Sequence, residues 1–189
     1  MLNAHPSRAP ELVLPVASLA ALRRALADAV GHDEAALALR EAGRAAAAAF
    51  FAALAPRTDS DDDAAASALR ELPNGRFWTR ITQLFAARGW GHLAQTSPHA
   101  GVGALSAHDW VEAEPDASAQ RPSCFFTTGL LAELLGRVAG DDMAVLEVEC
   151  RSRGDAQCRF LFGSPDALDA LFAELADGRP ADAALDALV

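Results

Sequence analysis

A pair of cysteines on either side of a turn sequence constrains the fold of this chain more than any other feature. Cys150 and Cys158 flank Gly154-Asp155, a dipeptide suited to a tight turn. If the chain folds back there, two antiparallel strands bring the cysteines face to face, because cross-strand partners place their Cβ atoms about 4.5–5.5 Å apart. Two thiolates at that separation suit one tetrahedral Zn²⁺, with Zn–S distances of about 2.3 Å. Cys124 and a carboxylate could then complete the shell.

Two other interpretations of the cysteines stay open at this point. Cysteine is often a small buried hydrophobic residue, and Cys150 and Cys158 could instead form a disulfide. The N-terminus lacks a basic region followed by an apolar run, so no secretory signal is indicated. Three cysteines, an odd number, also argue against a disulfide framework. These observations favour reduced thiols and a cytoplasmic protein.

Two segments around these cysteines resemble the 4-vinyl reductase domain family. One is the run CFFTTGLLAELLG that starts at Cys124, and the other combines EVEC, starting at Glu147, with GDAQCRF, starting at Gly154. The resemblance is specific over residues 124–162, looser over 77–115 and architectural over 12–55. The family includes the aromatic-sensing input domains of phenol- and xylene-responsive transcription activators and small proteins linked to bacteriochlorophyll synthesis. It is related in fold to subunits of vesicle-tethering complexes.

The resemblance implies a specific set of metal ligands. In the aromatic-sensing branch of the family, three cysteines and a glutamate hold zinc, which here implies Cys124, Glu147, Cys150 and Cys158, with Glu147 rather than Glu149 as the carboxylate. Strict strand alternation would place Glu147 and Cys150 on opposite faces, so the strand must bend or end near Cys150. A zinc with four protein ligands is closed, and hence structural rather than catalytic.

The hydrophobic periodicity predicts an α+β fold, with helices on one face of an antiparallel sheet of about four to five strands. We expect an N-terminal helical pair at 16–30 and 34–55, and further helices at 63–71, 75–88, 124–139 and from 165 onward. The expected strands are 90–96, 100–106, 108–114, 143–150 and 157–162. In domain terms, we predict a helical region over 1–62, a ligand-binding domain over 63–176 and a polar, frayed tail over 177–189.

Composition excludes several classes of function. The net charge is −10 and no basic patch is present, which argues against direct nucleic-acid binding. No uncharged apolar run approaches the length of a membrane span, about 18 residues or more. All 16 basic residues are arginine, and with the many alanines this indicates a GC-rich bacterial genome. We find no catalytic Ser/His/Asp arrangement and no phosphate-binding loop, so an enzyme is not favoured.

The alanine-rich helix at 34–55 predicts close helix–helix packing, because small side chains let a neighbouring helix approach. Members of the family that the chain resembles commonly pair, so we expect a homodimer that uses this helical region.

Aromatic residues gather in one part of the sequence, between Phe77 and Trp110. Such a cluster is either core packing or the lining of a pocket. In the aromatic-sensing branch, a Trp ahead of the first cysteine and a His contact the hydroxyl group of the ligand. We therefore expect an apolar cavity between the sheet and the helices at 75–88 and 124–139. The expected lining includes some of Trp78, Phe85, Trp110 and Phe126, with His108, or else His92, as its polar group.

The function that these observations favour is a sensor-type domain with a structural zinc that binds a small hydrophobic or aromatic molecule. A second interpretation is a tetrapyrrole-binding protein or accessory protein of a 4-vinyl reductase, which would carry a chlorophyll precursor. A third is a dimeric interaction scaffold without a ligand. The three differ in what lies between sheet and helices: a sealed aromatic cavity, a wide cleft or a filled core.

Overall fold

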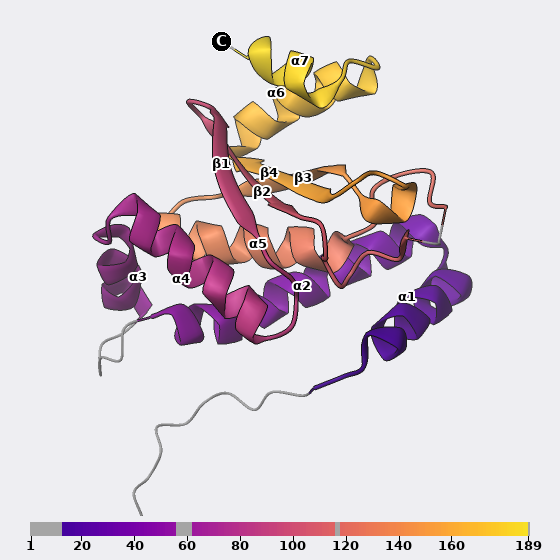
Figure 1. Ribbon diagram of the computed structural model, residues 1–189, viewed down its shortest axis with the longest axis horizontal. Coiled ribbons are helices and arrows are strands. Elements are labelled where there is room, and N and C mark those ends of the chain that lie inside the picture. Colours follow the sequence, from indigo (N-terminus) through magenta and orange to yellow (C-terminus); the bar gives the residue numbers. More distant parts are fainter. Residues whose placement is uncertain (1–12, 56–61, 116–117, 189) are drawn as a thin grey trace, which may run out of the picture.

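The computed structural model describes residues 13–55, 62–115 and 118–188. In these residues the chain forms a mixed α+β fold built on a four-stranded antiparallel sheet with the strand order β1-β2-β4-β3 (Figure 1). The helices are α1 (Val16–Val30), α2 (His32–Leu54), α3 (Asp62–Arg70), α4 (Asn74–Ala87), α5 (Phe125–Ala139), α6 (Pro165–Ala176) and α7 (Ala181–Asp186). The strands are β1 (Ala94–His99), β2 (Val102–Ala107), β3 (Ala144–Glu149) and β4 (Cys158–Gly163). The predicted fold class and N-terminal helices are confirmed.

Helices cover both faces of the sheet rather than one (Figure 1). Alternate residues of the central strands supply two cores: Leu105 and Phe160 face the core shared with α2, α4 and α5, whereas Ala104 and Leu161 face the core shared with α6 and α7. This follows from the period-two alternation of side chains on strands that are apolar on both faces. The segment expected to be a frayed tail contains α7, which buries Ala184 and Leu185 against the sheet.

The expected strand at 108–114 does not form. The chain turns away from the sheet after β2 and runs through turns toward α5. Its backbone hydrogen bonds there are local or go to a loop: Val111 donates to the carbonyl of Trp90, and Ala113 donates to that of Trp110. The path of residues 108–114 is instead fixed by Trp110, whose side chain is completely buried.

The predicted close packing of the alanine-rich helix occurs within the chain, between α2 and α5. Two glycines make the approach possible. A Cβ atom on Gly43 of α2 would lie 2.1 Å from the carbonyl oxygen of Phe126, and one on Gly129 of α5 would lie 2.0 Å from that of Arg40. The two backbones therefore touch at a point where no side chain fits. Among the described residues, no helix has the length and apolarity needed to cross a membrane.

Candidate metal centre

Four residues from three separate segments meet beneath the sheet. Cys124 immediately precedes α5, Glu147 lies on β3, Cys150 follows β3 directly, and Cys158 begins β4. All four are buried, and one potential ligand atom from each lies within 4.8 Å of the others. We call these residues the cysteine–glutamate cluster. The structure thus brings together all four residues that the sequence analysis named as metal ligands.

A β-bulge lets Glu147 and Cys150 reach the same point. Glu147 pairs with Phe160 and Glu149 pairs with Arg159, so two steps along β3 match one step along β4. The extra residue is Val148, which packs in the core on the side of α6 and α7. A bulge of this kind reverses the alternation that follows it. The side chain of Cys150 therefore returns to the face of Glu147, as the requirement for a bend near Cys150 had anticipated.

The turn that joins β3 to β4 is braced by Asp155. Its carboxylate accepts hydrogen bonds from the backbone N–H of Cys150 at 2.7 Å and from Nε of Arg153 at 2.9 Å. Arg153 also donates to the carbonyl of Val148 at 2.9 Å. Gly154 has a φ of 98°, in the left-handed region that favours glycine, so the tight turn predicted at Gly154-Asp155 is confirmed. These contacts hold Cys150 in place from its own loop.

The sulfur separations fit a shared metal ion and exclude disulfides. The Sγ atom of Cys124 lies 3.9 Å from that of Cys150 and 3.9 Å from that of Cys158. Thiolates at about 2.3 Å from one tetrahedral ion would be about 3.8 Å apart, whereas a disulfide needs about 2.05 Å. All three cysteines are free.

Glu147 supplies a separate sign that the cluster needs a further partner. One carboxylate oxygen, Oε2, accepts a hydrogen bond from the backbone N–H of Cys124 at 2.8 Å. The other, Oε1, is buried and has no hydrogen-bond partner. A buried carboxylate oxygen without a partner is costly, so a cation beside the three sulfur atoms would satisfy it.

The electrostatics of the cluster lead to the same conclusion. Burial, followed by the neighbouring Cys150, raises the pKa of Glu147 to about 9. Burial also raises the pKa of Cys124 well above its usual value. Several anionic groups cannot share a buried site unless a positive charge neutralises them. The donor set of three sulfurs and one carboxylate oxygen therefore suits a divalent ion that accepts thiolates.

A buried polar network lies next to the cluster, and the sequence analysis missed it. Glu112 is 1% exposed and caps the first turn of α5, because its carboxylate accepts from the N–H groups of Phe126 at 2.9 Å and Thr127 at 2.8 Å. The hydroxyl group of Thr127 donates to the same carboxylate and accepts from Nε1 of Trp110 at 2.9 Å. Burial raises the pKa of Glu112. No local motif marks this residue, since it lies 13 positions before the helix that it caps.

Three of the residues predicted to line a pocket come together in a packed group of rings. Phe85 and Trp110 are each 0% exposed, and their ring centroids are 5.5 Å apart. Phe126 stacks on Trp90 at 5.5 Å, and Trp90 lies 5.9 Å from Trp110. With Phe50 and Phe160, these residues form what we call the aromatic cluster. It fills the space between the sheet and α2, α4 and α5 where the sequence analysis expected an apolar cavity, so a ligand could enter there only if the rings moved apart.

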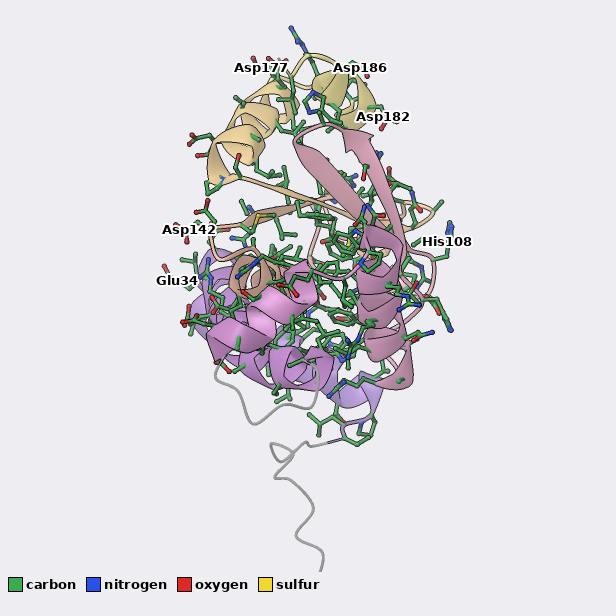
Figure 2. The ribbon with its side chains drawn as sticks, turned by 90° about the vertical axis from the view of Figure 1, so that its left-hand side faces the viewer. Glu34, His108, Asp142, Asp177, Asp182 and Asp186 are labelled. Atoms are coloured by element: carbon green, nitrogen blue, oxygen red, sulfur yellow. The ribbon has the colours of Figure 1, made fainter. Side chains whose placement is uncertain are left out.

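The other predicted pocket residues lie elsewhere. Trp78 packs against Phe77 and Phe162, at ring separations of 4.9 and 5.2 Å. His108 is exposed and points away from the molecule, where its Nδ1 lies 3.1 Å from the carbonyl oxygen of Ala156 (Figure 2). His92 is also exposed and pairs with Asp109 at 2.6 Å. Both histidines are therefore outside the aromatic cluster. The expected position of His108 rested on a strand that does not form.

Comparisons with known proteins agree with this architecture. The sequence model of the 4-vinyl reductase domain matches residues 107–164, which include every member of the cysteine–glutamate cluster, and this match confirms the resemblance to that family. No curated protein matches the chain.

Two solved structures share the fold. The phenol-responsive sensory domain of the transcription activator PoxR, crystallised with phenol, has a TM-score of 0.64 and 22% identity, over 90% of this chain and 84% of that one. A vinyl-4-reductase family protein from Methanocaldococcus jannaschii has a TM-score of 0.50 and 16% identity, over 80% of this chain and 82% of that one.

Proposed function

We propose that this chain is a sensor-type domain that binds a small aromatic molecule at the aromatic cluster and is held together by one structural zinc ion. The observation that carries the metal assignment is the unpartnered Oε1 of Glu147 beside three free thiols. When bound, zinc would cross-link the start of α5 to both strands of the β3–β4 hairpin. The ion would take all four of its ligands from Cys124, Glu147, Cys150 and Cys158, which would make its role structural.

The proposed ligand site follows from the surroundings of Trp110. Flat apolar rings surround its indole, and a preformed polar chain through Thr127 and Glu112 lies at its edge. Ligand sites are mostly apolar with a few placed polar groups, and this arrangement has both. Because His108 and His92 lie outside the cluster, we assign the polar role to Thr127 and Trp110 instead. The fold shared with a phenol-responsive sensory domain supports the sensor-type function as a whole.

The metal centre and the proposed ligand site share one helix start. Cys124 and Thr127 lie in the same turn at the beginning of α5, and Glu112 holds that turn by its N–H groups. A ligand that displaces Thr127 from Trp110 would therefore act on the helix that the metal anchors. This gives a physical route from ligand binding to a change in the fold, as a sensor requires.

Native mass spectrometry of the purified protein tests the proposal, because it measures metal, ligand and oligomeric state together. We expect one zinc ion per chain and added mass with phenol or xylene. Trp110→Ala should lose the aromatic ligand and retain the zinc. Protein purified without chelators that contains no stoichiometric metal would contradict the metal assignment. If the protein retains the metal but binds no aromatic compound, the interpretation as an interaction scaffold without a ligand would replace the sensor interpretation.

Two further expectations stay predictions. The homodimer is one, and the same mass spectrum measures it. The tetrapyrrole-binding alternative is the other, and the fold shared with a vinyl-4-reductase family protein is the observation that favours it. Co-purification of a coloured macrocycle would favour a tetrapyrrole, rather than a small aromatic molecule, as the ligand.

A further inference from the structure

A cavity lies beside β3, along the edge of that strand that faces away from β4. It has a volume of about 730 Å³, is open to solvent, and is lined by α2, the start of α5, β3 and the α6–α7 pair. None of the residues that line it belongs to the aromatic cluster. Its apolar lining is formed mainly by Leu37, Pro122, Phe125, Val145, Phe172 and Leu175. A cavity of this size is within the range of small-molecule sites, about 300–1,000 Å³.

Two large apolar side chains that line this cavity, which we call the cleft, are exposed to solvent. Phe172 of α6 is 59% exposed and Leu37 of α2 is 58% exposed, and they line the cleft from opposite helices. Single exposed apolar residues are common, but these two put an exposed apolar side chain on each side of one cleft. A ligand with an apolar body would cover both.

The lining of the cleft holds more arginines than acidic residues, unlike the protein as a whole. Four of the 16 arginines line the cleft, although the net charge of the chain is −10. Three of these have carboxylate partners: Arg121 pairs with Asp33 at 2.5 Å, Arg153 pairs with Asp155 at 2.7 Å, and Arg179 pairs with Glu174. The two acidic residues in the lining are Asp33, which is already paired, and Glu147, whose Oε2 bonds to Cys124.

Arg40 is the exception among the four. Within the described residues it has no carboxylate within 4.0 Å, and its guanidinium stacks on the ring of Phe125 at 5.1 Å from the centroid. Burial lowers its pKa, and the nearby charges of Arg44 and Arg121 lower it further. A half-buried guanidinium beside two like charges is an open position for an anion.

We propose that this cleft binds a small amphipathic anion, with its carboxylate or similar head group on Arg40 and its apolar body along Phe125 and Phe172. The planar guanidinium of Arg40 presents several N–H donors to a carboxylate. The apolar body would lie between α2 and α6 and cover the exposed ring of Phe172. This site is separate from the aromatic cluster and does not depend on the function proposed for it.

Three ligands with the same ten-carbon chain test the head group by isothermal titration calorimetry of the full chain. Decanoate should bind below the concentration at which micelles form, decanol should bind more weakly, and decyltrimethylammonium should not bind. Arg40→Gln should raise the Kd of decanoate by about tenfold or more, because a charge-assisted bond is lost. Arg137→Gln is the matched control, since Arg137 is a partly exposed arginine that pairs with Glu133 away from the cleft. It should leave the Kd unchanged.

A second variant tests the apolar half of the site without disturbing the core. Phe172→Ser changes an exposed ring and should weaken decanoate and decanol by similar factors, with the thermal unfolding temperature preserved. The proposal would be overturned if all three ligands bound equally, or if Arg40→Gln left the Kd of decanoate unchanged. It would also be overturned if decanoate bound the wild-type protein only with a Kd above about 1 mM. A stable dimer that Phe172→Ser converts to monomer would also overturn it, since a second copy would then cover the cleft.

Failure here is distinguishable from failure of the proposed sensor function. Aromatic compounds are titrated into the same Arg40→Gln protein, where their binding should be normal. Loss of decanoate binding with normal aromatic binding supports two separate sites. Competition between decanoate and phenol in the wild-type protein would show a single site and overturn this inference.

Discussion

Glu147 and Cys150 present their side chains to the same side of the sheet, although they are three residues apart on one chain segment. The bulge at Val148 produces this arrangement. Without it, Cys150 would face α6 and α7, and only two thiols would remain beside Glu147. The bulge is therefore as much a part of the candidate metal centre as the four side chains.

The first prediction concerns the thiols. Cys158→Ala should lower the free energy of unfolding by about 3 kcal/mol or more, because loss of a structural metal removes folding energy directly. Urea unfolding in the presence and absence of a chelator measures this. Ser123→Ala is the control, since its hydroxyl lies 3.8 Å from the Sγ atom of Cys150 and is not one of the four residues. Equal unfolding curves for Cys158→Ala and the wild type would contradict a structural metal.

The second prediction separates the two glutamates of β3. Glu147→Gln should lower metal affinity by at least the factor of about 10–100 typical for loss of a partner around a metal, because it removes the anionic ligand. Glu149→Gln is the matched control, because Glu149 hydrogen-bonds Gln157 at 2.9 Å on the other face. Elemental analysis after dialysis against a weak chelator gives the metal content. Loss of metal from Glu149→Gln alone would reverse the assignment.

The third prediction concerns the contact between α2 and α5. Gly43→Ala should destabilise the protein by about 1–3 kcal/mol or more, since the added methyl group would lie 2.1 Å from a carbonyl oxygen. Gly75→Ala in α4 has no atom within 4 Å of the new methyl group and should be neutral, or stabilising by up to about 1 kcal/mol. Thermal unfolding of both variants provides the comparison. Similar unfolding temperatures would mean that the helices can separate at little cost.

The fourth prediction is a pH dependence that arises from Glu112. Burial raises the pKa of this carboxyl in the folded state, so the unfolded chain loses the proton at a lower pH than the folded chain. The stability that Glu112 contributes is thus fully present below its unfolded pKa of about 4.3, and it declines as the pH rises through the folded pKa. The difference in unfolding free energy between the wild type and Glu112→Gln should therefore shrink as the pH rises from about 5. A difference that grows with pH would show that Glu112 is anionic throughout.

The fifth prediction tests the polar edge of the aromatic cluster. Trp110→Phe keeps a ring in place but leaves the hydroxyl of Thr127 without its donor. It should lower the free energy of unfolding by about 1 kcal/mol for the lost hydrogen bond, with a further loss because the phenyl ring fills less of the core. Trp110→Ala should cost about 3–5 kcal/mol because it opens a cavity in the core. Chemical unfolding gives both values. A cost for Trp110→Phe as large as that for Trp110→Ala would assign most of the energy to the indole N–H.

The residues of the candidate metal centre were predictable because the turn at Gly154 and the family resemblance both point to them. The sequence showed that the strand must bend or end near Cys150 for Glu147 and Cys150 to meet. It did not show where, since nothing in the run EVEC marks Val148 as the extra residue. The helices were readable from their periodicity, and α7 was missed because a six-residue helix with two acidic residues has a weak apolar pattern. Glu112 and the turns at 108–114 were missed for a common reason. Their positions depend on contacts with the start of α5, which local sequence does not encode.

The attachment of α1 has a consequence for how the molecule opens. This helix buries none of its residues, and Arg23 connects it to the carbonyl oxygens of Glu112 and Ser123. Ser123 directly precedes Cys124, so α1 is joined to the loop that leads into the metal centre. A helix held by the polar contacts of Arg23 and of Arg24, which pairs with Glu114, detaches at far lower free energy than the core unfolds. In hydrogen–deuterium exchange, the amides of α1 should therefore exchange through local opening, well before those of α5.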